Sequence, residues 1–324
     1  MLQALWSWVI DPFQYQFMVK ALGVGVLVGV VCAVLSCFVT LKGWSLMGDA
    51  VSHSVLPGVV LAYLVGLPFG IGAFVFGLGS VLVISWVSAN TRLRADAVIG
   101  IVFTAFFGFG LILVSKLPSM AEWMNATFGY LPPLLSVKSI LFGNVLGIAD
   151  ADIVQTAIAG GITLALVLVF RKDLLLFCFD PNHARAIGLN TGLLSFMLLS
   201  LLALTIVAAL QTIGIVLVVA MLVTPGAIAY MLTNRFDRML LLAVVASVTS
   251  CVVGIYASYY LNASTGGCIV FVQALLFLVV LALAPQRGLL AQAWNKRAQR
   301  NAAQSLPPQL PLPERERGSQ KASS

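Results

Sequence analysis

Charged side chains are scarce in this chain. Asp, Glu, Lys and Arg together make up 9% of its 324 residues, whereas hydrophobic residues make up 60%. Soluble domains are about a quarter charged, so this composition excludes an ordinary soluble domain and indicates a polytopic membrane protein. The apolar runs are continuous and do not alternate with polar residues, so they predict an all-α bundle of transmembrane helices and not a barrel.

The chain also lacks the sequence motifs of several enzyme classes. It contains no Gly-Lys dipeptide, so it has no Walker A loop with which to bind ATP. Neither of its two histidines stands in an HExxH motif, and no GxSxG nucleophile elbow occurs. We therefore expect no catalytic residues in this chain.

The cysteines form no pattern typical of a disulfide framework or a metal site. The five cysteines are scattered, odd in number and without a CxxC pair, so they do not indicate a disulfide framework. Most of them lie in apolar runs, and we interpret them as small buried hydrophobic residues rather than as metal or redox ligands.

The net charge of +7 indicates membrane orientation rather than nucleic-acid binding. No basic face is interleaved with aromatic residues, so we expect no nucleic-acid partner. Lys and Arg gather in the loops 90–96, 170–173 and 233–238 and in the tail after Pro285. The positive-inside rule assigns these loops and the tail to the cytoplasm.

Apolar windows of about 20 residues predict nine spans. In chain order these are 17–40, 52–68, 70–89, 97–115, 153–170, 191–210, 212–232, 239–261 and 267–284. Only Gln211 separates 191–210 from 212–232, so this pair forms either two spans or one long broken helix, and eight spans is the alternative count. Nine crossings place the segment 116–152 outside, where Glu122, Asp150 and Asp152 have no assigned role.

Three segments differ in composition. Residues 1–16 carry aromatic side chains typical of a membrane interface. Residues 17–284 hold all the predicted spans and form the transmembrane domain. Residues 285–324 are polar, Pro-rich and basic, so we expect a disordered cytoplasmic tail.

Two ionisable residues stand beside a predicted span, in the stretch SLMGDAVSHSVLPGVV (45–60). Asp49 and His53 are four residues apart, so they share one face of a helix, which Gly48 and Pro57 are expected to loosen. Ionisable groups in a membrane are costly and commonly functional, and carboxylate plus imidazole is a partial ligand set for Mn²⁺, Fe²⁺ or Zn²⁺. Because two ligands are too few, a second copy across a two-fold axis would complete the site. The alternative is that Asp49 caps a helix and bonds to His53 or a backbone N–H.

The loop 178–190 contains a second polar feature. Asp180 is typical of an N-cap, Pro181 of the first helical position and Gly188 of a C-cap, so a short helix of about seven residues is predicted. The residues between them are Asn182, His183, Ala184, Arg185, Ala186 and Ile187. This helix would either dock a cytoplasmic partner or serve as a connector, and we interpret His183 as a solvated side chain.

Six motifs, occurring in order, resemble the permease subunits of ABC importers for manganese, zinc and iron. They are LMGDAVSHSVLPGV (46–59), DAVIGIVF (96–103), ILFGNVLGI (140–148), FDPNHARAIGL (179–189), ALQTIGIVLVVAMLVTPGAIA (209–229) and SYYLNASTG (258–266). The resemblance extends over about residues 17–284 and excludes the tail.

This resemblance implies a division of labour. Two permease subunits, identical or paralogous, would form the pathway, separate cytoplasmic subunits would hydrolyse ATP, and an extracytoplasmic protein would deliver the metal. Asp49 and His53 match the family's pathway ligands, and the helix 180–188 matches its coupling helix, which docks on the ATPase. The chain would be no enzyme, would hold no permanent cofactor, and would cross the bacterial inner membrane several times to transport Mn²⁺, Fe²⁺ or Zn²⁺.

Two other transport functions are alternatives. An ABC permease for a chelated metal or siderophore would need a wide cavity rather than a paired ligand site. An ion-coupled secondary metal transporter would also place polar residues at broken helices, but it would need no ATPase. Oxygen and imidazole ligands suit all three metals, so the sequence does not select one.

Overall fold

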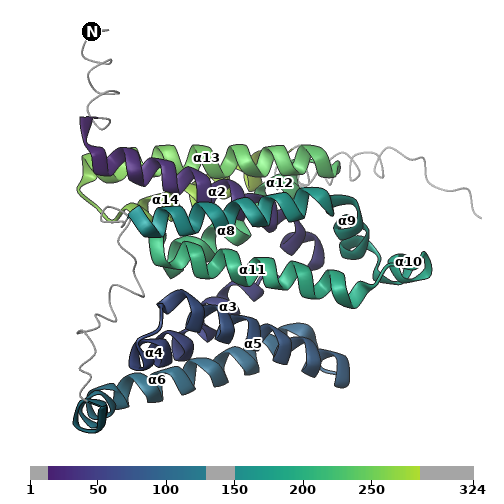
Figure 1. Ribbon diagram of the computed structural model, residues 1–324. Helices are drawn as coiled ribbons and strands as arrows, with labels where there is room; N and C mark the ends of the chain where they lie inside the picture. The colour runs from purple at the N-terminus through teal and green to yellow at the C-terminus, as the bar shows by residue number, and fades with distance from the viewer. Residues whose placement is uncertain (1–13, 129–149, 285–324) are drawn as a thin grey trace, which may run out of the picture.

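The computed structural model describes residues 14–128 and 150–284, and every long regular element in these ranges is an α-helix (Figure 1). This confirms the all-α prediction for the described part of the chain. The helices are α2 (Gln16–Lys42), α3 (Met47–Ser54), α4 (Leu56–Val65), α5 (Phe69–Asn90), α6 (Ala95–Phe128), α8 (Asp150–Val169), α9 (Arg171–Phe179), α10 (Pro181–Ala186), α11 (Thr191–Ile213), α12 (Ile215–Leu232), α13 (Phe236–Leu261) and α14 (Thr265–Leu283).

The described ranges contain nine segments that are long and apolar enough to cross a membrane, with α3 and α4 together forming one of them. The prediction of nine spans is therefore confirmed there. Most of the predicted interfacial segment 1–16 and the whole of the predicted tail 285–324 lie outside the described residues. So does the stretch 129–149 of the predicted outer loop.

Gly214 separates α11 from α12 and decides between two spans and one broken helix. Its φ of 81° and ψ of 166° belong to a region that only glycine enters readily. From this break α12 returns toward the end of the bundle where α11 began. The next helix starts there, and the ring centroid of its Phe236 lies 5.1 Å from that of Phe38 in the last part of α2. The two helices are therefore separate, antiparallel spans.

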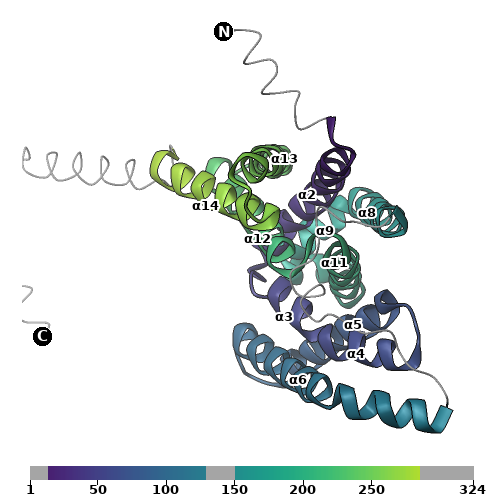
Figure 2. The ribbon, with the colours of Figure 1, turned by 90° about the vertical axis from the view of Figure 1, so that its left-hand side faces the viewer.

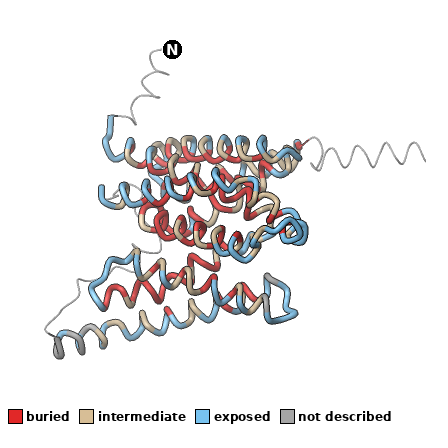
Figure 3. Tube along the Cα trace, turned by 45° about the vertical axis from the view of Figure 1, so that its right-hand side comes forward, coloured by how far each residue is buried: buried red, intermediate tan, exposed pale blue. Residues whose placement is uncertain are grey.

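The helices form two groups. Viewed along the bundle in Figure 2, α3, α4, α5 and α6 lie on one side, and α2, α8, α9 and α11 to α14 lie on the other. The buried positions lie in the interior of the bundle, between neighbouring helices (Figure 3). Helix α14 exposes much of its apolar surface. Such large exposed apolar surfaces suit contact with lipid or with another membrane subunit.

The two ends of the bundle differ in charge. One end, called the basic end below, carries Lys42, Arg92, Arg94, Arg171, Lys172, Arg185, Arg235 and Arg238. The opposite end carries the α4–α5 turn, the start of α8 and the α13–α14 turn. Lys20, a basic residue near this opposite end, forms a salt bridge with Asp150. The positive-inside rule therefore predicts that the basic end faces the cytoplasm.

Candidate metal site

The Asp49 and His53 side chains lie on α3, a helix of eight residues that follows α2 at the basic end. The helical path is interrupted at Val55 before α4 begins. Pro57, the second residue of α4, has no N–H with which to continue the hydrogen-bond ladder. The sequence prediction of a loosened helix is therefore confirmed, and the interruption sets α3 apart as a short element of its own.

Asp49 and His53 contact each other as the four-residue spacing predicts. His53 Nε2 lies 3.3 Å from Asp49 Oδ1, and the two side chains are 28% and 43% exposed. Charge-assisted hydrogen bonds are commonly about 2.7–2.9 Å long, so the pair is loosely joined. Asp49 does not cap the helix, because the N-cap is Leu46 and has no side-chain cap bond. The contact with His53 is the part of the capping alternative that the structure retains.

The His53 ring packs against two aromatic side chains of α6. Its centroid lies 5.7 Å from that of Phe103 and 5.1 Å from that of Phe107. The buried Nδ1 atom has no hydrogen-bond partner among the described residues. Leaving a buried polar atom unpaired costs on the order of 1–3 kcal/mol. The described part of one chain therefore leaves this imidazole incompletely satisfied, as expected of half a site.

A small void adjoins the ring. Its volume is about 10 Å³, roughly the space that one water molecule needs. It is lined by Ser52, His53, Val55, Leu56, Val59, Phe107, Leu210 and Ile215. Within residues 14–128 and 150–284, no three His, Cys, Asp or Glu side chains gather closely enough to hold a metal ion. The described residues of a single chain thus supply two candidate ligands, Asp49 and His53, and not a closed site.

The cysteines do not contribute to a metal site. Four of them are buried, the fifth is partly buried, and none forms a disulfide. In α9, burial raises the pKa of the Cys178 thiol to about 12, so the thiol stays protonated at neutral pH, whereas metal binding requires the thiolate. Their interpretation as buried hydrophobic residues agrees with this placement.

The predicted short helix in the loop 178–190 is α10. The Asp180 carboxylate accepts hydrogen bonds from the backbone N–H groups of Asn182 and His183, both at 3.0 Å. Pro181 occupies the first turn, where its missing N–H costs nothing. The N-terminal half of the prediction is therefore confirmed in detail.

The C-terminal end of α10 differs from the prediction. The helix ends at Ala186 and its C-cap is Ile187, so it has six residues rather than seven. Gly188 follows the cap with a φ of 91° and donates to the Arg185 carbonyl, while Leu189 donates to that of Ala184. This pair of bonds is a Schellman motif, in which glycine occupies the position after the cap.

Two contacts join α9, the helix that precedes α10, to the rest of the basic end. Lys42 Nζ donates to the Phe177 carbonyl at 3.2 Å and lies 3.9 Å from the centroid of the Phe177 ring. Arg171 Nη1 lies 2.9 Å from Asp237 Oδ1 at the start of α13. Lys42 is the last residue of α2, and α3 follows it after a short turn. The contact between Lys42 and Phe177 therefore connects α9, which precedes α10, to the helix that carries Asp49 and His53.

These features agree with comparisons against known proteins. Residues 14–284 match the model of the ABC 3 transport family. The chain belongs to this family. It is 58% identical to the manganese transport system membrane protein MntB of Synechocystis sp., over 90% of this chain and 91% of that protein. It is 48% identical to the chelated iron transport system membrane protein YfeD of Yersinia pestis, over 86% and 89%.

The fold is also similar to a solved structure, PsaBC from Streptococcus pneumoniae in complex with Fab. The TM-score is 0.74 at 35% sequence identity, over 91% of this chain and 99% of that chain. The resemblance inferred from the sequence motifs is confirmed. With nine membrane-spanning segments in the part of the chain that the structure describes, the chain is a multi-pass membrane protein of an ABC transport system.

Proposed function

We propose that this chain is the permease subunit of an ABC importer that carries a divalent transition metal ion into the cytoplasm. The observation that carries the proposal is the Asp49–His53 pair on α3, whose imidazole is only partly satisfied within one chain. The names of similar proteins refer to manganese and iron transport, so we expect Mn²⁺ or Fe²⁺ as cargo ahead of Zn²⁺.

The cargo is proposed to be a bare or nearly dehydrated ion. Carboxylate oxygen and imidazole nitrogen are ligands that these divalent ions accept. The void beside His53 holds about 10 Å³, which is far too small for a siderophore or another chelate. This favours the metal ion over the chelated-metal alternative at this position.

Two permease subunits, identical or paralogous, are proposed to bring two such pairs together across the pathway. If both subunits carry the pair, two carboxylates and two imidazoles would surround the ion as transient ligands. Each imidazole must be neutral at its ligating nitrogen, since a protonated ring has no lone pair to offer. An extracytoplasmic metal-binding protein would deliver the ion, and alternating access would release it into the cytoplasm of a bacterium.

ATP hydrolysis is assigned to separate cytoplasmic subunits. The basic end would face them, and α10 would be the helix on which they dock. Movement of α10 would reach α2 and α3 through α9, where Lys42 contacts Phe177, and would reach α13 through Arg171 and Asp237. The Asp49–His53 site would then open alternately to either side.

Reconstitution tests this function directly. We expect proteoliposomes that contain this chain, its partner permease and the ATPase subunits to take up radioactive Mn²⁺ only with ATP and the loaded binding protein. An ATPase subunit whose Walker A lysine is replaced serves as the inactive control. Gradient-driven uptake by the chain alone would instead establish an ion-coupled secondary transporter.

Docking on α10 gives a second prediction. Asp180→Ala removes the acceptor for two backbone N–H groups, and loss of an N-cap costs about 1 kcal/mol. Because the helix has only six residues, we expect it to fray and the ATPase subunit to copurify several-fold less well. Asp173→Ala removes the same charge from the neighbouring α9 without removing a cap, and should copurify normally. Equal recovery from both variants would refute the docking role.

A further inference from the structure

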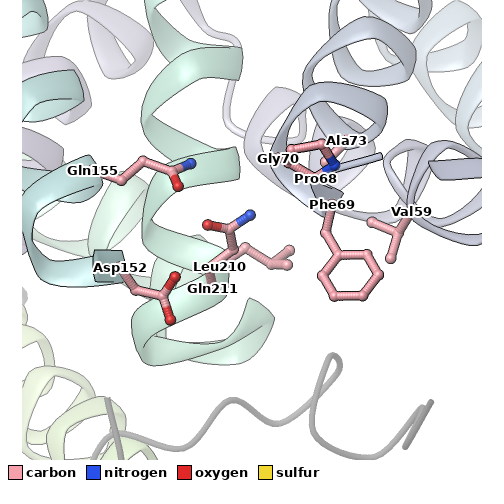
Figure 4. Close-up of a pocket in the computed structure, with 9 residues that line it drawn as sticks. All are labelled: Val59, Pro68, Phe69, Gly70, Ala73, Asp152, Gln155, Leu210 and Gln211. Atoms are coloured by element: carbon pink, nitrogen blue, oxygen red, sulfur yellow. The ribbon is translucent and has the colours of Figure 1, made fainter. Parts of the chain in front are cut away.

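A pocket of about 340 Å³ lies at the opposite end of the bundle, away from the basic loops. Figure 4 shows it between α4 and α5 on one side and α8 and α11 on the other. Its lining consists of Val59, Pro68, Phe69, Gly70, Ala73, Asp152, Gln155, Leu210 and Gln211. Asp152 is the one charged side chain in this lining, and the two glutamines are its other polar side chains.

The two glutamine amides converge on the first turn of α5. A Cβ placed on Gly70 would lie 2.9 Å from Gln155 Nε2 and 3.1 Å from Gln211 Nε2. Because glycine has no side chain, both amide groups can approach the backbone at this position. Neither amide has a hydrogen-bond partner among the described residues, and Asp152 has no ion-pair or hydrogen-bond partner there. Three polar side chains from α8 and α11 thus line one cavity with free bonding capacity.

The neighbouring carboxylate is differently placed. Asp150 lies two residues before Asp152 on α8, is largely exposed, and is paired with Lys20 of α2. It does not line the pocket. Of the two aspartates at the start of this helix, only Asp152 lines the pocket, and it has no ion-pair partner among the described residues.

We propose that Asp152, Gln155 and Gln211 form a reception site for a partly hydrated divalent cation on its way to the Asp49–His53 pair. The proposal rests on the proposed transport function. Carboxylate and amide oxygens are hard ligands that suit Mn²⁺, and the amide N–H groups can donate to ligands of the ion's hydration shell. The volume accommodates an ion with several waters, since a water molecule occupies about 30 Å³ of liquid. With a single carboxylate the site binds weakly, so the ion can move on.

The pocket adjoins the void at His53. Val59 and Leu210 line both spaces, so these two apolar side chains form a wall between them. A hydrated ion does not cross an apolar wall without losing water, which is costly. The structure therefore corresponds to a state in which the reception site is closed off from the Asp49–His53 pair, and separation of Val59 from Leu210 would open the passage.

Mn²⁺ binding to the purified full transporter tests the site, with Mn²⁺ alone as the probe and equilibrium dialysis with electron paramagnetic resonance as the readout. We expect Asp152→Asn to weaken one class of bound Mn²⁺ about tenfold, which corresponds to a loss of about 1.4 kcal/mol. Gln155→Glu adds a carboxylate and should tighten the same class, a gain that misfolding cannot produce. Asp150→Asn removes an equal charge outside the pocket and should bind as the wild type does.

The same assay separates this site from the proposed transport site. The double variant Asp49→Ala with His53→Ala should lose the other class of Mn²⁺ and retain the reception site. If Asp152→Asn and Gln155→Glu both bind Mn²⁺ as Asp150→Asn does, the reception site is refuted, whatever the double variant shows. If Asp152→Asn loses Mn²⁺ while the double variant binds normally, the reception site stands and the Asp49–His53 assignment fails.

Discussion

We expect His53→Ala and Asp49→Asn each to reduce metal uptake by the assembled transporter by about 100-fold or more, while the subunits still assemble and hydrolyse ATP. Replacing a residue that only hydrogen-bonds to a metal ligand already costs about 10–100-fold in affinity or activity, and these variants would remove a proposed ligand itself. In a homodimer each substitution removes two of four ligands, one from each copy. The measurement is the initial rate of Mn²⁺ uptake into proteoliposomes, normalised to assembled complex.

A control on the same helix distinguishes ligand loss from general damage to α3. The Ser54 hydroxyl is buried and has no hydrogen-bond partner among the described residues. Ser54→Ala therefore removes an unsatisfied group and should leave uptake unchanged and stability equal or slightly higher. Wild-type uptake by both His53→Ala and Asp49→Asn would contradict the ligand assignment.

Gly58→Ala should prevent the chain from reaching its folded state. A Cβ at this position would lie 2.1 Å from the carbonyl oxygen of Gly72, and a Cβ on Gly72 would lie 2.2 Å from that of Gly58. These contacts join the backbones of α4 and α5, so no side-chain rotation relieves them. Small residues permit such close approach in a membrane, and overpacking here should cost about 3 kcal/mol or more.

The measurement is the yield and thermal midpoint of the detergent-solubilised protein by fluorescence-detected size-exclusion chromatography. Gly79→Ala on α5 is the matched control, because a Cβ there meets nothing within 4 Å. The control should match or slightly exceed the wild type, since alanine favours a helix more than glycine does. Identical midpoints for Gly58→Ala and Gly79→Ala would show that the two helices do not depend on this close approach.

The fold was largely predictable from the sequence because the length and hydropathy of an apolar run identify a membrane span. Two spans depart from their predicted positions. The span predicted at 97–115 continues to Met120, into the predicted outer loop, and the span predicted at 52–68 lies at Met47–Val65. Gly48, Asp49 and His53 lower the local hydropathy, so an apolar window misses the first turns of α3. At the other end Gly66, with a φ of 76°, terminates α4 before the window closes.

The candidate metal pair was predictable because its spacing is local. Asp49 and His53 lie one turn apart, so a helix alone brings them together. The surroundings of the imidazole were not predictable, because Phe103 and Phe107 come from α6, some fifty residues later in the chain. Burial of Nδ1 follows from that long-range packing and not from any local pattern.

The reception pocket could not be predicted from the sequence, for a related reason. Gln155 and Gln211 are uncharged residues in apolar surroundings, and they are 56 positions apart, so only the packing of α8 beside α11 brings their amides together. The signal that could have found them is the presence of amide side chains within spans that are otherwise apolar. The sequence assigns Asp152 no role, because it does not distinguish this residue from the ion-paired Asp150.

The central claim is that His53 ligates the transported metal in the assembled transporter. Pulsed electron paramagnetic resonance of Mn²⁺ bound to the purified complex tests it most directly, because a ligating imidazole produces nitrogen hyperfine coupling. We predict that this coupling is present in the wild type and in Ser54→Ala and Asp152→Asn, and that it is lost in His53→Ala. Unchanged nitrogen coupling in His53→Ala, or none in the wild type, would contradict the account.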